Sequence, residues 1–269
     1  MIPVNQIICG NNIDIISKWP NDCVDLTVTF PPYDNLRTYK GYTFDFENIT
    51  KQLYRITKPG GVVVWVVGDA TIKGSETGTS FKQALYFKEV GFNLHDTMIY
   101  EKNSFSYPSK VRYNQIFEYM FVFSRGKPKT LNLLKDKKNK YGGTSSWGNI
   151  TKRDKNENLI DIGKKITVND FGLRNNIWRY NTGRGFSSKD KESFKHPAIF
   201  PEKLAHDHII SWSNKRDVIL DPFMGSGTTC KEALKLCRQY IGIDISQEYC
   251  NIAQQRLNEV NLPKRPRLK

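Results

Sequence analysis

The chain has few of the residues from which metal centres, disulfides and membrane spans are built. Its 269 residues include five cysteines, without a Cys-x-x-Cys pair, and four histidines. The histidines lack the spacing of metal ligands, so no metal site is expected. The longest apolar run, Val62 to Val67, is far too short to cross a bilayer, and no apolar secretion signal opens the sequence. These absences favour a reduced, cytoplasmic protein without a membrane partner.

Acidic residues are also scarce. The 27 Asp and Glu are outnumbered by 41 Lys and Arg, and the net charge of +14 favours a polyanionic partner. Residues 125–195 contain 18 basic and 7 acidic side chains, so this segment carries +11 of that charge. Aromatic residues are interleaved with the charges, which argues against plain disorder. The combination is typical of a nucleic-acid-binding surface, and a solvated charged face is the alternative.

Strand patterns alternate with helical patterns through most of the chain. This alternation predicts an α/β fold with a doubly wound, mostly parallel sheet of seven strands. The expected strands are 6–9, 24–29, 62–67, 94–100, 116–123, 218–220 and 240–243. The length suits a single domain, residues 1–269. Residues 125–195 show no sustained period and are too long for a simple connection, so they are predicted to be an irregular insertion.

One segment near the end of the sequence has the pattern of a nucleoside site. An apolar run reaches Asp221 and a turn with Gly225 and Gly227, and a helical pattern comes next. The following apolar run ends at Asp244, at the spacing where Rossmann-type sites place an acid for the ribose hydroxyls. Neither the dinucleotide fingerprint nor a Gly-Lys-Ser/Thr phosphate loop is present, which favours a ligand without phosphates. A tight turn without a ligand is the alternative.

A second segment stands at the end of an early strand. Residues 30–34, Phe-Pro-Pro-Tyr-Asp, come directly after the strand at 24–29, and the two prolines stiffen the turn there. Ligands of open α/β sheets bind beyond the carboxyl ends of the strands. We therefore expect this segment to face the glycine-rich turn, although about 190 residues separate the two in sequence.

Together the two segments resemble the S-adenosyl-L-methionine-dependent DNA amino-methyltransferases. Pro31-Pro32-Tyr33 and the stretch 221–229, Asp-Pro-Phe-Met-Gly-Ser-Gly-Thr-Thr, match two motifs of that family. Their order along the chain is similar to that of the circularly permuted β class. Segments at 58–61, 117–128 and 196–203 match as well, so the resemblance covers nearly the whole chain. It implies a Rossmann-like methyltransferase fold in which residues 125–195 form the target-recognition region.

The resemblance also implies roles for individual residues. S-adenosyl-L-methionine would be the cofactor, with Asp221 facing its ammonium group and Asp244 its ribose. The other residues implied in cofactor binding are Gly10, Asn11, His196, Pro197, Phe200, Pro201, Pro222, Phe223, Gly225, Ser226, Gly227 and Thr228. The Pro31 carbonyl would accept a hydrogen bond from the target amino group, and Tyr33 would stack on a base flipped out of the duplex.

The sequence departs from the family at Phe30. That position ordinarily holds Asp, Asn or Ser, whose side chain is a second acceptor for the amino hydrogens, and phenylalanine offers none. The loss of one such hydrogen bond costs on the order of 3 kcal/mol, or about a hundredfold in rate. Asp34 is a nearby substitute, so the candidate catalytic residues are Phe30, Pro31, Pro32, Tyr33 and Asp34. A slow enzyme, a site completed by Asp34 and an inactive variant all remain open.

The sequence thus favours a site-specific methyltransferase of the restriction-modification type, acting on double-stranded DNA. The target is the exocyclic amino group of cytosine (N4) or adenine (N6), and Thr29-x-Pro-Pro-Tyr33 leans slightly to cytosine. One alternative is a DNA-binding protein on a methyltransferase scaffold, silenced at Phe30. Another is an enzyme that methylates RNA or a protein side chain. A cognate restriction endonuclease and a homodimer remain open as further partners.

Overall fold

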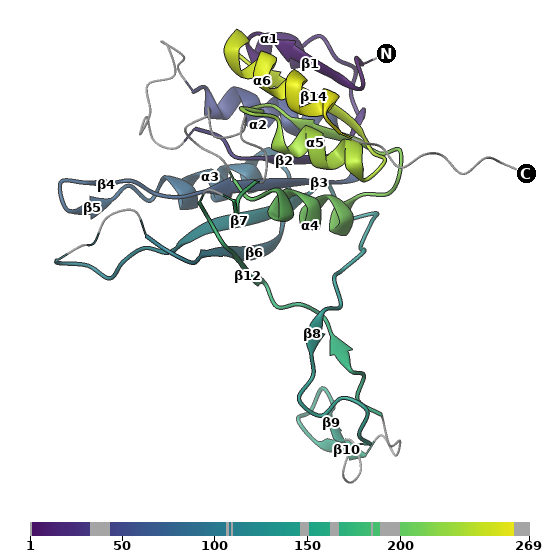
Figure 1. Cartoon of the computed structure of the whole chain (residues 1–269). Helices are drawn as coiled ribbons and strands as arrows, with labels where there is room; N and C mark the ends of the chain where they lie inside the picture. The colour runs from purple at the N-terminus through teal and green to yellow at the C-terminus, as the bar shows by residue number, and fades with distance from the viewer. Residues whose placement is uncertain are drawn as a thin grey trace, which may run out of the picture. The chain divides into compact units, whose positions relative to one another are not determined.

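Eight strands form one sheet in the larger of two compact units, Met1–Asn132 with Asn176–Lys269 (Figure 1). The structure is a computed structural model and describes residues 2–32, 44–105, 108, 110–145, 151–161, 167–183, 185–188 and 200–260. All neighbouring strands are parallel except β7, which is antiparallel to both of its neighbours. In sheet order the strands are β1 (Gln6–Cys9), β14 (Gln239–Asp244), β13 (Val218–Asp221), β2 (Val24–Thr29), β3 (Thr57–Val67), β7 (Phe117–Ser124), β6 (Asn93–Lys102) and β12 (Ile177–Tyr180).

The predicted α/β class with a mostly parallel sheet is confirmed, but the predicted number of strands is wrong. Seven strands overlap the predicted runs, and β12 is an eighth at the edge of the sheet, parallel to β6. It lies in the region without a sustained period, and four residues are too few to give a clear pattern. Contacts distant in sequence hold it instead: Trp178 and Tyr180 are buried, and the Tyr180 hydroxyl donates to Asp207 Oδ2 over 2.7 Å.

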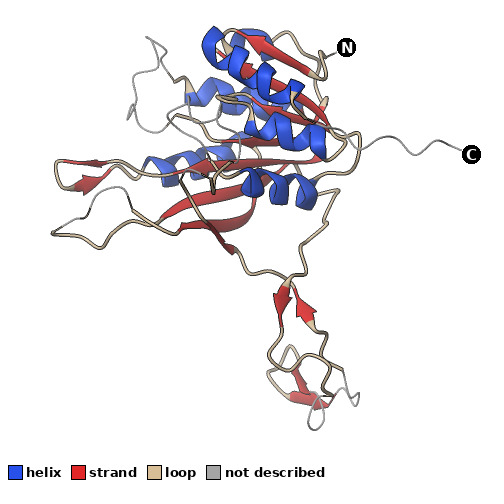
Figure 2. Ribbon diagram, in the orientation of Figure 1, coloured by secondary structure: helices blue, strands red, loops and turns tan. Residues whose placement is uncertain are grey.

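Helices cover both faces of the sheet (Figure 2), as a doubly wound fold requires. One face carries α1 (Asn12–Ile16), α2 (Phe46–Ile56) and α3 (Thr79–Val90), each of which packs against the next. The helices α4 (Glu202–Trp212), α5 (Thr228–Lys235) and α6 (Gln247–Asn258) do so on the other. Helix α2 illustrates how the sequence sets an element. Asp45 caps its first turn, Ile49 and Leu53 recur at helical spacing and are buried, and the helix ends just before Lys58-Pro-Gly-Gly61.

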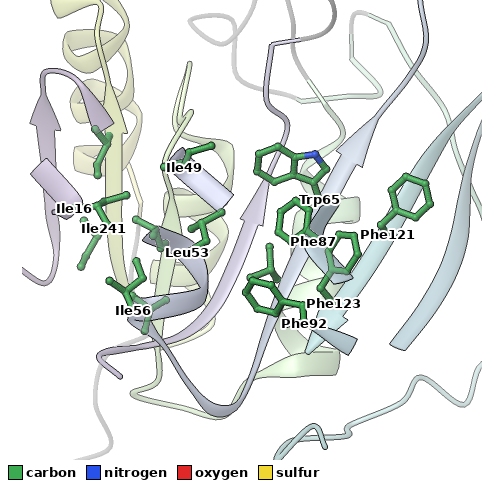
Figure 3. Packing of buried hydrophobic residues seen from close by; sticks show 14 of the residues in the cluster. Ile16, Ile49, Leu53, Ile56, Trp65, Phe87, Phe92, Phe121, Phe123 and Ile241 are labelled. Carbon is green, nitrogen blue, oxygen red and sulfur yellow. The ribbon is translucent and has the colours of Figure 1, made fainter. Parts of the chain in front are cut away.

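A large cluster of buried apolar residues lies between the sheet and the first three helices (Figure 3). Residues 62–67 of β3 are all buried because the strand lies inside the sheet and both of its faces are covered. Trp65 points to the side of α2 and α3, where its Nε1 donates to Gln83 Oε1 over 2.9 Å. The rings of Phe87 and Phe123 stack there with centroids 4.1 Å apart. This packing fixes β3 and its neighbour β2, whose carboxyl end carries part of the site.

The second unit, Leu133–Asn175, is built from two short antiparallel ladders. One pairs β8 (Lys137–Lys138) with β11 (Phe171–Gly172), and the other pairs β9 (Thr151–Arg153) with β10 (Leu159–Asp161). None of its described residues is buried, so main-chain hydrogen bonds hold it rather than an apolar core. In the larger unit, β4 (Thr71–Ile72) and β5 (Ser75–Glu76) form a further small hairpin.

Candidate active site

The carboxyl ends of β2 and β13 meet at the middle of the sheet. The Thr29 hydroxyl, at the end of β2, donates to Asp221 Oδ1, at the end of β13, over 2.7 Å. Thr229, in the first turn of α5, donates to the Val28 carbonyl over 3.2 Å. The expected proximity of the two strand ends is therefore confirmed. From this junction the strand order runs in opposite directions, since β3 lies next to β2 on one side and β14 lies next to β13 on the other. Such a reversal of strand order is the switch point at which open α/β sheets bind ligands.

Asp221 has one carboxylate oxygen without a hydrogen-bond partner in the part of the chain that the structure describes. The residue is only 1% exposed. Its Oδ1 accepts hydrogen bonds from Thr29 and from the Phe223 amide, whereas Oδ2 is the oxygen left over. Burial raises the pKa of this carboxyl to about 6. A buried, unpaired oxygen is costly for the protein alone, so its presence fits a ligand that brings a cationic or hydrogen-bonding group.

The glycine-rich turn is fixed from two sides. Gly225 and Gly227 have φ of 53° and 79°, the left-handed region that glycine adopts most readily. The Gly225 amide donates to Asp244 Oδ2 over 2.9 Å. A Cβ on Gly227 would lie 2.6 Å from the Cβ of Ala253 in α6, so only glycine permits this approach. The amide groups at the start of α5 are thereby presented just beyond the strand end.

Asp244 lies at the end of β14, as the sequence spacing predicted. Its Oδ1 accepts from the Ser246 amide over 2.8 Å and its Oδ2 from Gly225. Burial raises the pKa of Asp244 above its ordinary value. Each carboxylate oxygen has two acceptor positions, so the two amide contacts leave capacity for hydroxyl donors such as those of a ribose.

The first strand brings Gly10 and Asn11 to the same edge of the sheet. The Gly10 amide donates to the Asp244 carbonyl over 2.9 Å. The Asn11 side chain caps α1, with its Oδ1 accepting from two amides of the first turn, including that of Ile13 at 2.8 Å. The next residue, Asn12, is buried, and its Nδ2 donates to the Pro222 carbonyl over 3.0 Å. Sequence reasoning missed Asn12, whose only signal is a polar residue at a buried helical position.

Phe30 is paired with Phe200. Their rings stack with centroids 3.9 Å apart and planes 11° from parallel, which joins the end of β2 to the segment before α4. Pro31 is buried and Pro32 is partly buried. Pro201, also buried, caps the start of α4. The predicted residues Tyr33, Asp34, His196 and Pro197 lie outside the described residues.

A buried ion-pair network lies behind the turn, and sequence reasoning missed its central residue, Arg256. This side chain of α6 is 0% exposed. Its Nη1 donates to the carbonyl and hydroxyl oxygens of Ser226 and to Thr228 Oγ1, and its Nη2 donates to Glu202 Oε1 over 2.9 Å. The signal was positional, because Arg256 shares the buried stripe of α6 with Ala253.

Glu202 is the acceptor on which this network converges. Besides Arg256, it accepts hydrogen bonds from Ser188 at 2.7 Å and from Lys231 at 2.8 Å, and Lys235 lies 3.3 Å away. Burial alone would raise the pKa of Glu202. The hydrogen bonds from Lys231 and Ser188, with the charges of the two lysines, outweigh burial and lower the pKa to about 2. Glu202 is therefore a carboxylate throughout the physiological range.

Other titratable residues have structural partners. Asp69, at the end of β3, accepts from the Ser80 amide over 2.8 Å and caps α3. His208 is fully buried, and its Nδ1 lies 3.3 Å from the Trp212 indole nitrogen. Across the part of the chain that the structure describes, no cluster of three His, Cys, Asp or Glu suits a metal ion. No helix within those residues is long and apolar enough to cross a bilayer.

We expect Gly227→Ala to destabilise the protein more than Gly126→Ala. Both glycines have left-handed φ values, 79° and 75°, so either substitution costs about 1 kcal/mol of backbone strain. A Cβ on Gly126 would meet no described atom within 4 Å, whereas one on Gly227 meets Ala253, which adds about 1–3 kcal/mol of overpacking. Urea unfolding of both variants measures the difference, and Ala253→Gly should restore part of the loss. Equal losses would show that α6 yields to the added methyl group.

Comparison with known proteins places this geometry in a family. The DNA methylase family model (N6_N4_Mtase) matches residues 24–255. The chain is 61% identical to the orphan methyltransferase M.BamHII of Bacillus amyloliquefaciens over 248 residues, which cover 91% of this chain and 93% of that protein. It is 26% identical to the type II methyltransferase M.BglII of Bacillus subtilis, covering 95% of this chain and 69% of that one.

Solved structures share the fold. The PvuII DNA methyltransferase (cytosine-N4-specific) superposes with a TM-score of 0.69 at 21% identity, covering 95% of this chain and 88% of that one. M1.HpyAVI, solved as its SAM complex, superposes with a TM-score of 0.62 at 24% identity, covering 94% and 99%. The extent of the family match and the identity to M.BamHII show that this chain is a member of the DNA methylase family.

Proposed function

We propose that this chain transfers a methyl group from S-adenosyl-L-methionine to the exocyclic amino group of a cytosine or adenine in double-stranded DNA. The observation that carries the proposal is the junction of β2 and β13, where the Thr29–Asp221 hydrogen bond sets a cofactor-type strand end beside Pro31. Membership of the DNA methylase family and the 61% identity to M.BamHII support DNA as the substrate.

The residues at the strand ends suit the parts of S-adenosyl-L-methionine. Asp221 Oδ2, buried and without a partner among the described residues, would accept from the methionine ammonium, and Asp244 would accept from the ribose hydroxyls. The glycine-rich turn would cover the cofactor between them. The segment that includes Phe200 and Pro201, with His196 and Pro197, would lie against the methionyl end. When bound, the cofactor supplies an electrophilic methyl group on a sulfonium sulfur.

The chain's part in the reaction is to position a weak nucleophile. The lone pair of an exocyclic amino group is delocalised into the base. The Pro31 carbonyl, accepting one amino hydrogen, would hold that hydrogen out of the ring plane and so direct the lone pair toward the methyl group. Tyr33 would stack on the flipped base, and Asp34 is the candidate for a second acceptor. The Thr29-x-Pro-Pro-Tyr33 context makes cytosine the first target to test.

DNA recognition would fall to the region 125–195. Its compact part, the second unit, has 10 Lys and Arg against 5 Asp and Glu over residues 133–175. None of its described side chains is buried, so its basic residues lie at the surface, where phosphates and base edges could be contacted; Arg174 is paired with Asp136. The relative M.BamHII is named an orphan methyltransferase, and this name gives no support for a partner nuclease. A cognate endonuclease and a homodimer therefore stay predictions from the resemblance.

The second candidate function is DNA binding without methyl transfer. The observation that favours it is the Phe30–Phe200 stack, which fills the position of the usual polar acceptor with an apolar ring. Cofactor binding does not separate the two candidates, since the residues for it are intact in either case. The test must therefore detect the methyl group on DNA.

Methylation-aware sequencing separates the candidates. The chain would be expressed in a host that lacks DNA methylation, and genomic DNA would be sequenced for N4-methylcytosine and N6-methyladenine. We expect one short sequence motif to be modified at one base, and no modification with an Asp221→Asn variant. Unmodified DNA from cells that contain folded, cofactor-binding protein would reject the transferase and favour the silenced alternative.

Cofactor affinity should depend on pH through Asp221. Because the pKa of its carboxyl is raised to about 6, the group is mostly ionised above pH 7 and gains a proton as the pH falls through 6. Only the carboxylate attracts the methionine ammonium. Between pH 7 and pH 5 we expect the Kd for S-adenosyl-L-methionine to rise by up to about tenfold. Isothermal titration calorimetry measures this, and Asp221→Asn should bind weakly with a flat profile. A flat wild-type profile would place the ammonium elsewhere.

Restoring the acceptor at position 30 should raise methyl transfer. We expect Phe30→Ser to increase tritium incorporation from labelled cofactor into DNA by about tenfold or more, with cofactor affinity nearly unchanged. Phe30→Ala is the matched control, since it also removes the ring from Phe200 but adds no hydroxyl. If serine gives no more incorporation than the wild type or alanine, the missing acceptor does not limit the rate.

A further inference from the structure

One buried side chain joins two segments that lie on different elements of the candidate site. Arg256 contacts Ser226 in the glycine-rich turn and Thr228 at the start of α5 through Nη1. Through Nη2 it contacts Glu202, the first residue of α4, which comes directly after Phe200 and Pro201. The guanidinium thus lies between the turn and the segment that stacks on Phe30.

The chemistry of the guanidinium suits this bridging position. Arginine presents donors in a rigid planar fork, so one nitrogen can bond the turn while the other bonds Glu202. The three donors of a lysine ammonium group share one nitrogen, so they do not span the turn and Glu202 as the two nitrogens of the guanidinium do. Glu202 Oε1, which accepts from Arg256, also accepts from Lys231 of α5 and from Ser188, and the Glu202 amide donates to the Ser187 carbonyl over 2.9 Å. Hydrogen bonds through one guanidinium thus link the two segments directly.

Stability alone does not account for this arrangement. The Arg256 side chain is fully buried and the Glu202 side chain is 19% exposed, so both charges lose much of their hydration, and such an ion pair gains little over a well-packed apolar pair. An apolar residue at position 256 would continue the stripe formed by Ile252 and Ala253, but it could not bond the Ser226 carbonyl. The arginine donates to the glycine-rich turn, and the position of this turn determines where a ligand would bind.

We propose that Arg256 is a positioning residue that sets the separation between the glycine-rich turn and the Phe200–Pro201 segment, and thereby the affinity for S-adenosyl-L-methionine. The inference rests on the proposed function only in taking that cofactor as the ligand. Arg256 does not touch the cofactor in this assignment. It acts through the Ser226 carbonyl on one side and through Glu202 on the other.

The chain offers a matched control at the other end of β2, away from the candidate site. Asp25, near the start of β2, pairs with Lys58 over 2.7 Å and accepts from the Val218 amide, at the start of β13, over 2.9 Å. The ion pair joins β2 to β3, and the hydrogen bond from the Val218 amide joins β2 to β13, both at the ends opposite the candidate site. Asp25→Asn should therefore lower stability without moving the turn.

The test compares cofactor binding with stability in four full-length variants. Arg256→Met, Arg256→Lys, Glu202→Gln and Asp25→Asn would be titrated with S-adenosyl-L-methionine by calorimetry, and their melting temperatures measured with and without it. We expect Arg256→Met to raise the Kd at least tenfold, Arg256→Lys and Glu202→Gln at least threefold, and Asp25→Asn less than twofold. In methylation assays the KM for the cofactor should rise with the Kd, and kcat at saturating cofactor should change by less than threefold.

Each outcome decides for or against the proposal. A Kd for Arg256→Met within threefold of the Asp25→Asn value would overturn it and leave the arginine a purely structural role. If Arg256→Met does not fold, a rise in Kd of threefold or more over the wild type in both Arg256→Lys and Glu202→Gln supports the proposal, and a smaller rise in either overturns it. A wild-type chain that binds the cofactor but leaves DNA unmethylated would reject the proposed function, while the comparison of Kd values would still stand.

Discussion

The hydrogen bond between Thr29 and Asp221 is the contact on which the candidate site depends. It joins residues 192 positions apart and lies fully buried where β2 and β13 end side by side. Because the two strands are parallel neighbours, the segments after their carboxyl ends emerge on the same edge of the sheet. The bond also occupies only one oxygen of Asp221. The other oxygen is buried without a partner among the described residues, and the carboxyl has a raised pKa, a state that a cationic ligand would stabilise.

The parts that the sequence predicts correctly are those written in local patterns. The unbroken apolar run 62–67 predicts a strand covered on both faces, and the structure confirms it. Ile49, Leu53 and Ile56, at helical spacing, predict α2, and the proline and glycines at 58–61 predict its end. The turn with Gly225 and Gly227 was expected from spacing, and its left-handed backbone explains why glycine stands there.

The parts that escaped prediction depend on contacts between distant segments. β12 is a strand because Trp178 and Tyr180 are buried beside β6 and α4. The sequence of its four residues alone does not favour a strand. Arg256 resembles an ordinary charge on an exposed helix until α6 is packed on the turn. Phe30 was an evident departure from the family pattern, but its partner Phe200 could not be named, since stacking depends on how α4 approaches β2. Local patterns thus define the elements, whereas these pairings arise only in the folded chain.

The arrangement explains why the order of motifs along the chain does not matter to the site. β1, near the start of the chain, pairs with β14, near its end, and β13 inserts between β14 and β2. The chemistry requires that the four carboxyl ends share one edge, and parallel pairing secures this whichever strand is synthesised first. A consequence is that neither the first nor the last third of the chain holds a complete site, because Asp221 without Thr29, or Pro31 without the glycine-rich turn, lacks its partner. Under the proposed function, cofactor binding would be coupled to the pairing of β2 with β13, because a ligand that binds only the folded junction stabilises it.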